Sequence, residues 1–162
     1  AICTPAGSEW MTELDFDRGV FSDWFSEQAG RSGDLQIEPM RGGGSCDMFA
    51  LTSSDERFVV RRAPLTAVSD TAHDVVREFK VIQALTGDGL RVPEVLLACD
   101  DDAVLGAPFY IMRYVDGEVI RRKLPDHYIA KPETQPAIGE ELIDALVELH
   151  AFDWRGTAME NL

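Results

Sequence analysis

The sequence predicts an α+β domain in which a five-stranded antiparallel sheet carries a helix on one face. Short apolar runs bounded by glycine, proline or acidic residues are typical of strands, and five of them lie at 35–40, 48–51, 58–62, 95–98 and 108–115. A strongly periodic segment at 72–85 separates the third run from the fourth. Its apolar residues recur every three or four positions, which is typical of a helix with one buried side.

Charge and length limit the partners that the chain can have. Its net charge is −14 at pH 7. Nucleic acids and anionic lipid surfaces repel so acidic a chain, and neither is expected as a partner. Its 162 residues suffice for one domain, or for one lobe of a larger protein. No apolar stretch approaches the ~20 residues that span a bilayer.

Cysteine and histidine usage predicts a cytoplasmic protein without a metal site. The cysteines lie far apart and form no CxxC pair: Cys3, Cys46 and Cys99. This spacing disfavours a disulfide framework or a zinc site and suits a reducing compartment. The histidines are equally dispersed: His73, His127 and His150. The first ten residues do not resemble a signal peptide, and we interpret Met11 as the natural start and 1–10 as an added leader.

The segments around the sheet divide the chain into three predicted parts. Apolar residues from 15 to 28 have helical spacing, and Gly30 and Gly33 are expected to end this first helix. The acidic run 100–102 is predicted to be a solvated turn, and 118–135 an irregular connector. The parts are 1–34 with the leader and first helix, 35–117 with the sheet, and 118–162 with the connector and a last helix.

The last helix has an apolar side that needs a partner. It is expected to begin near Pro136, because proline is tolerated in the first turn of a helix. Its apolar stripe comprises Ile138, Leu142, Ile143, Leu146, Val147 and Leu149. Little sequence remains to cover this stripe. We expect either that a second lobe packs against it or that the 136–151 helix mediates self-association.

Two features of the sheet region could bind phosphate. Successive glycines at 42–44 let the backbone approach an anion and offer N–H donors to it, although three glycines alone are more typical of a plain loop. Alternation along 58–62 places Val59 and Arg61 on one face of the sheet and the other three residues on the opposite face. One arginine therefore points into whatever the sheet covers, and arginine binds phosphate oxygens bidentately.

An inward arginine needs an anionic partner, because an unpaired buried charge is costly. Glu78 lies one helical turn from both Val75 and Ile82, on the core-facing side of the predicted helix. A pair ~4 Å apart at an effective dielectric of about 20 gains about 4 kcal/mol before desolvation. Alternatively, Glu78 belongs to the solvated face with Arg77 and Lys80, and its spacing alone slightly favours this second possibility.

Together these elements resemble the amino-terminal lobe of the protein-kinase fold, and more specifically the aminoglycoside phosphotransferase family. The ordered match covers roughly residues 37 to 153. It comprises GGGSCDMFAL, FVVRRAPL, VVREFKVIQAL, RVPEVLLACDDDAVLGAPFYIMRYVDGEVI and ELIDALVELHAFD. The resemblance implies a nucleotide-binding lobe of a parent protein that uses ATP and Mg²⁺ and transfers the γ-phosphoryl group to a hydroxyl of an unidentified small molecule.

The resemblance also implies roles for nine residues. Arg61 falls where kinases have the phosphate-binding lysine, and Glu78 matches the helix glutamate that pairs with it. Met112 would lie at the back of the nucleotide pocket. The hinge that hydrogen-bonds adenine would comprise Arg113, Tyr114 and Val115. The turn that covers the phosphates would comprise Gly43, Gly44 and Ser45, and it departs from the G-x-G-x-x-G pattern of protein kinases.

The family's catalytic loop and its metal-binding aspartate have no match here. Asp153 and Asn161 follow the last helix without the family's loop around them, so we assign no catalytic residue and no metal ligand. We expect the chain alone to be inactive, as a truncated or cleaved piece or as a lobe completed by another polypeptide. Two alternatives stay open: a non-catalytic kinase-like module for binding or assembly, and a soluble α+β domain whose glycine turn and Arg61–Glu78 pair are only structural.

Overall fold

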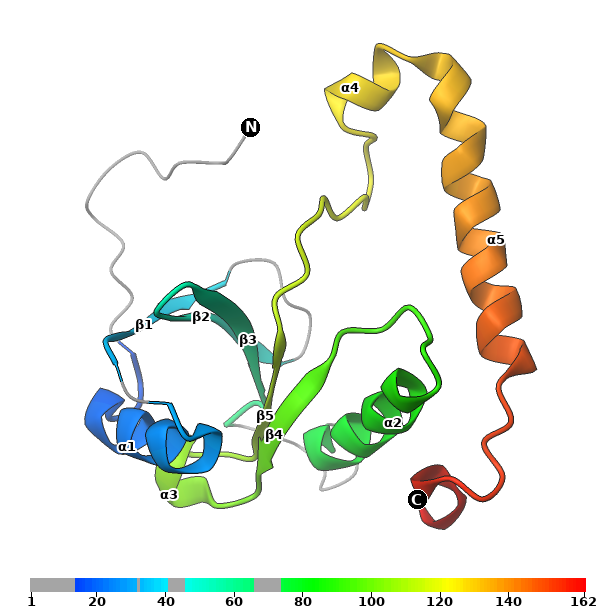
Figure 1. Ribbon diagram of the computed structural model, residues 1–162. Helices are drawn as coiled ribbons and strands as arrows, with labels where there is room; N and C mark the ends of the chain where they lie inside the picture. The colour runs from blue at the N-terminus through cyan, green and yellow to red at the C-terminus, as the bar shows by residue number, and fades with distance from the viewer. Residues whose placement is uncertain (1–13, 32, 41–45, 66–73) are drawn as a thin grey trace.

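A computed structural model describes residues 14–31, 33–40, 46–65 and 74–162, arranged as Figure 1 shows. The strands are β1 Leu35–Pro39, β2 Asp47–Ser53, β3 Glu56–Arg62, β4 Val95–Cys99 and β5 Phe109–Arg113. The α-helices are α1 Arg18–Ala29, α2 Val75–Gly87, α3 Asp102–Leu105, α4 Asp126–Ile129 and α5 Gln135–Ala151. Two 3₁₀ helices are η1 Pro132–Thr134 and η2 Ala158–Asn161. The described chain is therefore α+β, as the sequence predicts.

The strands form one antiparallel sheet in the order β1-β2-β3-β5-β4. β5 lies between β3 and β4, although it follows both of them in the chain. In the register between β3 and β5, Arg61 is opposite Tyr110 and Phe58 is opposite Arg113. The end of β5 therefore lies beside the beginning of β3. The predicted five-stranded antiparallel sheet is confirmed.

Helices pack on both faces of the sheet, and side-chain alternation divides the core into two clusters. On one face α1 and α3 pack against Phe49, Leu51, Phe58, Val60, Phe109 and Ile111. On the other face α2 packs against Cys46, Ala63, Val95, Ala107 and Tyr110. Figure 1 shows α1 and α2 separated by the sheet. The sequence predicts the helix on the α2 face, and the layer formed by α1 and α3 is an addition to that prediction.

Helix α1 contributes aromatic side chains to the sheet. Phe21 and Phe25 are 0% and 2% exposed, and the Phe21 ring lies 5.9 Å from the ring of Phe109. Asp17 caps the helix by accepting hydrogen bonds from two backbone N–H groups of its first turn. Gly30 ends the helix with φ 62°, a conformation that glycine adopts without strain. The predicted first helix is confirmed, with its start shifted to Arg18.

Two segments that the sequence predicts as irregular contain short helices. Asp101 accepts a hydrogen bond from the Ala103 N–H and so caps α3, in which Val104 and Leu105 are buried. The predicted solvated turn at 100–102 is thus the start of a helical turn. The 118–135 connector likewise contains α4 and η1. The run 100–102 is exposed, as predicted, but the short helices in both segments were not predicted, since one helical turn is too short to display a 3.6-residue period.

Helix α5 stands apart from the sheet in Figure 1, at the end of the extended segment after β5. Pro136 lies in its first turn, as predicted. Its apolar stripe is exposed: Leu142 is 63%, Ile143 60% and Val147 60% exposed. Arg91, which lies between α2 and β4, bonds to Glu141 and Glu148 of α5 at 2.6–2.9 Å. No helix in the described residues is long and apolar enough to cross a membrane.

Candidate nucleotide site

Arg61 and Glu78 form an ion pair between β3 and α2. The Arg61 Nε atom donates to the Glu78 Oε2 atom at 2.9 Å, and the two side chains are 26% and 38% exposed. β3 directs Arg61 toward α2, and Glu78 lies in the first turn of that helix. The predicted pair is present, and the alternative of a Glu78 directed to solvent is not borne out. Burial acts to lower the pKa of Arg61, but the hydrogen bond and charge of Glu78 outweigh it and raise that pKa.

The outer end of the Arg61 guanidinium is available to a ligand. Its Nε–H is donated to Glu78, while within the described residues neither Nη group has a hydrogen-bond partner. A guanidinium held at Nε presents its two Nη groups in a fixed direction, a geometry that suits two oxygens of a phosphate. The site therefore fits an anionic group of a nucleotide on chemical grounds.

Tyr110 lies beside the Arg61–Glu78 pair, and the sequence analysis did not assign it to the site. It lies opposite Arg61 on the neighbouring strand and is 1% exposed. Burial raises the pKa of its phenol strongly, and the Glu78 carboxylate raises that pKa further. The phenol therefore stays neutral beside the ion pair. Only the strand order could have revealed this neighbour, because Arg61 and Tyr110 are distant in the sequence.

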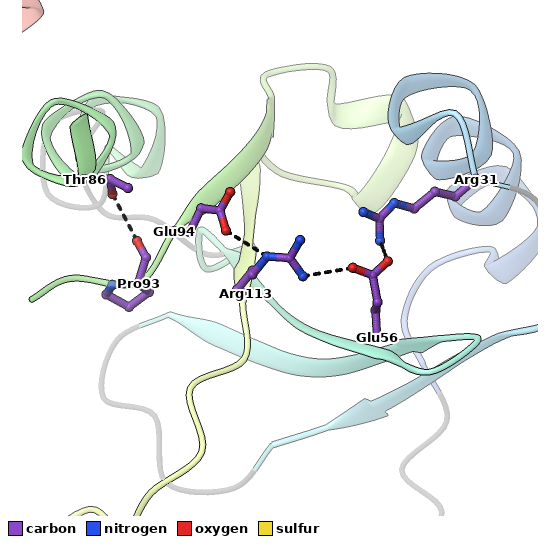
Figure 2. Close-up of polar contacts among 6 residues, drawn as sticks. All are labelled: Arg31, Glu56, Thr86, Pro93, Glu94 and Arg113. Atoms are coloured by element: carbon purple, nitrogen blue, oxygen red, sulfur yellow. Dashed lines mark hydrogen bonds and ion pairs between the residues drawn. The ribbon is translucent and has the colours of Figure 1, made fainter. Parts of the chain in front are cut away.

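Met112 and Arg113 point to opposite faces at the end of β5. Met112 packs in the α2-side cluster, on the same face as Arg61. The Arg113 guanidinium instead bonds to Glu94 at 2.7 Å and to Glu56 at 2.9 Å on the other face. Figure 2 shows this network continuing from Glu56 to Arg31. The Arg113 side chain is therefore engaged with two carboxylates on the face away from Arg61.

Backbone hydrogen bonds distinguish the three predicted hinge residues. β5 ends at Arg113 rather than at the predicted residue 115. The Arg113 N–H donates to the Glu94 carbonyl at 2.8 Å, and the Tyr114 N–H donates to the Arg57 carbonyl at 3.0 Å. Val115 is 66% exposed, and no described residue accepts a hydrogen bond from its N–H. Of the three predicted hinge residues, Val115 is therefore the one whose N–H has no partner among the described residues.

The predicted phosphate-covering turn, Gly43, Gly44 and Ser45, lies outside the described residues. The described chain resumes at Cys46, which is buried in the α2-side cluster. Two residues later, Met48 of β2 is opposite Arg61 of β3. The strand beside Arg61 therefore begins two positions after Ser45 in the sequence.

Arg62 is a buried arginine that the sequence analysis did not assign to the site. Its role is structural. It is 2% exposed. Its guanidinium bonds to Asp15 at 2.7 and 2.8 Å, to Asp47 at 2.8 Å and to the Leu105 carbonyl at 2.9 Å. Arg62 thus joins the segment before α1, the start of β2 and the end of α3. Both Nη groups of Arg62 are bonded to described residues, so they are not available to a nucleotide.

Metal ligands are not grouped in the part of the chain that the structure describes, where no three His, Cys, Asp or Glu side chains converge. Asp153 is 70% exposed and bonds to Arg155. The described cysteines, Cys46 and Cys99, are buried free thiols.

Comparison with known proteins identifies the family. A model of the phosphotransferase enzyme family matches residues 36–161. The chain belongs to this family. A crystal structure of a candidate aminoglycoside phosphotransferase from Ralstonia eutropha JMP134 superposes with a TM-score of 0.70 and 25% sequence identity, over 90% of this chain and 41% of that one. The kinase-like fold predicted from the resemblance is confirmed.

Curated relatives of this chain are named after a second enzyme class, the acyl-CoA dehydrogenases. Acyl-CoA dehydrogenase family member 11 of Gallus gallus is 32% identical over 97% of this chain and 20% of its own length. Acyl-CoA dehydrogenase family member 10 of Mus musculus is 28% identical over 80% of this chain and 12% of its own length. The chain therefore spans a fifth or less of these two relatives and under half of the structural neighbour.

Proposed function

We propose that this chain is the nucleotide-binding lobe of an ATP-dependent phosphotransferase. The observation that carries the proposal is the Arg61–Glu78 pair, in which Glu78 holds Nε and neither Nη group has a partner among the described residues. Family membership supports phosphoryl transfer as the reaction class. The proposal of nucleotide binding is supported by the charge of Arg61 and by its position on the same face of the sheet as Met112.

The proposed reaction moves the γ-phosphoryl group of ATP to an alcohol. The acceptor oxygen forms a bond to the γ-phosphorus, the bond from that phosphorus to the β,γ-bridging oxygen breaks, and ADP leaves with the electron pair. The acceptor's proton passes to a base, which we do not assign to this chain. Bound Mg²⁺ would supply positive charge to the phosphate oxygens, and we assign no ligand of it to this chain. Arg61 contributes by binding phosphate oxygens. The Val115 N–H contributes by donating a hydrogen bond to the adenine ring.

The acceptor class is proposed from the names of the relatives. Both are acyl-CoA dehydrogenases by name, and an alcohol kinase on such a polypeptide would meet acyl thioesters as substrates. A hydroxylated acyl-CoA is therefore the first acceptor to test in the parent protein. Release of ADP from ATP should require this acceptor, and a parent protein that uses other alcohols equally well would contradict the assignment.

Calorimetric titration of the chain with Mg-ATP tests nucleotide binding. We expect one saturable site, and no comparable heat with inorganic phosphate, which lacks the base and two of the three phosphates. If neither this chain nor its parent protein binds Mg-ATP, the proposed function is wrong.

A second candidate function is assembly through α5. The supporting observation is the exposed stripe, whose members Leu142, Ile143, Leu146, Val147 and Leu149 are 44–63% exposed. A contiguous apolar surface of this kind is typical of an interaction site. Light scattering distinguishes the two functions: a concentration-dependent dimer that Leu146→Glu disrupts would support assembly, whereas a monomer at all concentrations would contradict self-association.

A further inference from the structure

The beginning of β3 contacts the predicted hinge through two consecutive residues. Glu56 and Arg57 begin β3, and the register that places Phe58 opposite Arg113 brings them next to the end of β5. Each contacts a different part of the hinge. Glu56 bonds to the side chain of Arg113, and Arg57 contacts the residues that follow it.

Glu56 binds the side chain of Arg113, the first predicted hinge residue. Its carboxylate lies between the guanidinium groups of Arg31 and Arg113, and Figure 2 shows the three side chains in a row with Glu94 beyond them. The hydrogen bond from Arg113 lowers the pKa of Glu56, so this carboxylate stays charged. Both guanidinium groups also lie over the Phe58 ring, at 5.0 and 5.8 Å from its centroid. The hinge thus begins at a residue whose side chain and N–H are both engaged.

Arg57 contacts the residues on both sides of Val115. Its carbonyl accepts from the Tyr114 N–H at 3.0 Å, and its guanidinium carbon lies 3.8 Å from the centroid of the Tyr114 ring. The same guanidinium bonds to the Asp116 Oδ1 atom at 2.6 Å. One side chain therefore contacts both neighbours of Val115, Tyr114 by stacking and Asp116 by an ion pair.

We propose that Arg57 is a positioning residue that orients the Val115 N–H toward the nucleobase. The inference rests on the proposed function, since it concerns the base end of the same site. Arg57 itself does not touch the phosphates, because it lies at the opposite end of β3 from Arg61. Loss of Arg57 should therefore weaken recognition of the base and leave phosphate binding intact.

Two probes separate these effects: Mg-ATP, which has a base, and inorganic tripolyphosphate with Mg²⁺, which has none. We expect Arg57→Ala to weaken Mg-ATP binding by roughly five- to tenfold, the equivalent of one hydrogen bond, without changing the affinity for tripolyphosphate. Arg57→Lys should lose less, because lysine keeps the charge near Tyr114 and Asp116 but not the planar stack. Arg61→Ala should weaken both probes.

Arg155→Ala is the matched control. Arg155 is also an exposed arginine that bonds to an aspartate, Asp153, and lies over an aromatic ring, Trp154, but it is far from the hinge in the sequence. Its loss should change neither affinity. Circular dichroism checks the fold of each variant, and Asp116→Asn provides a second, milder test of the same contact.

The outcomes separate this inference from the proposed function. If Arg61→Ala weakens Mg-ATP binding while Arg57→Ala and Asp116→Asn behave like Arg155→Ala, only the positioning role is overturned. An equal loss of both probes in Arg57→Ala would also overturn it, because that pattern indicates a general structural effect. Absence of Mg-ATP binding by the unmodified protein would overturn both proposals.

Discussion

Arg62 and Asp15 form a two-point ion pair, with Nη1–Oδ1 and Nη2–Oδ2 distances of 2.8 and 2.7 Å. The arginine side chain is 2% exposed and the aspartate 45%. The adjacent Arg61 points to the other face and leaves its Nη groups without a described partner. Two consecutive arginines of β3 thus have different tasks: Arg62 joins segments of the lobe, and Arg61 is available to a ligand.

Replacement of Arg62 should destabilise the lobe. Arg62→Met removes the hydrogen bonds to Asp15, Asp47 and the Leu105 carbonyl, and that buried carbonyl loses a donor. We expect the free energy of unfolding to fall by about 2–3 kcal/mol, less than for a fully buried pair because both aspartates can be hydrated. Urea denaturation measures the change. Arg155→Met should leave the denaturation midpoint unchanged, and equal midpoints for the two variants would contradict the structural role.

The same pair predicts a pH dependence of stability. The hydrogen bond from Arg62 lowers the pKa of Asp15 below its ordinary value, against the opposing effect of burial. Its contribution is therefore fully present above the unfolded pKa of about 3.9 and is lost as pH falls toward the lower folded value. Asp15→Asn should be less stable than the unmodified chain at pH 6, and the difference should shrink below about pH 4. A difference that stays constant with pH would refute this linkage.

Helix α1 should be an integral part of the sheet's core. Phe21 is fully buried against Phe109, whereas Val20 on the same helix is 44% exposed. Phe21→Ala should cost about 3–5 kcal/mol through lost burial and the cavity left behind, and Val20→Ala no more than about 0.5 kcal/mol. Thermal and urea unfolding measure both. If the two variants have similar stabilities, α1 contributes little to the lobe.

The contacts of Arg91 should control the position of α5. They join the loop after α2 to Glu141 and Glu148 of a helix that has no buried residues. Exposed ion pairs are screened by salt. The distance distribution between spin labels on α2 and α5 should therefore broaden in 1 M salt and in Arg91→Ala, and the variant should no longer respond to salt. A distribution unaffected by either change would show that other contacts hold α5.

Local patterns predicted most of the fold, and long-range contacts explain what they missed. The strands and the helices α1, α2 and α5 are long enough for their periodicity to be visible in the sequence. α3 and α4 are single turns, so they escaped detection. Asp15 and Arg62 are 47 positions apart, and no local pattern connects them.

The candidate site was predicted in part. The resemblance identified Arg61 and Glu78, and the structure places them in contact. The neighbour Tyr110 and the engagement of Arg113 depend on β5 lying beside β3, an order that strand patterns do not encode. The nucleotide roles of Met112, Arg113, Tyr114 and Val115, and those of Gly43, Gly44 and Ser45, remain predictions.

The most direct test of the account is the dissociation constant of Mg-ATP for the unmodified chain and for Arg61→Ala, with Arg155→Ala as the control for charge. Removing a charge-assisted contact to phosphate should weaken binding by roughly 10- to 100-fold, and the control should bind as the unmodified chain does. Equal affinities for all three proteins would contradict the claim that Arg61, held by Glu78, is the phosphate-binding residue of this lobe.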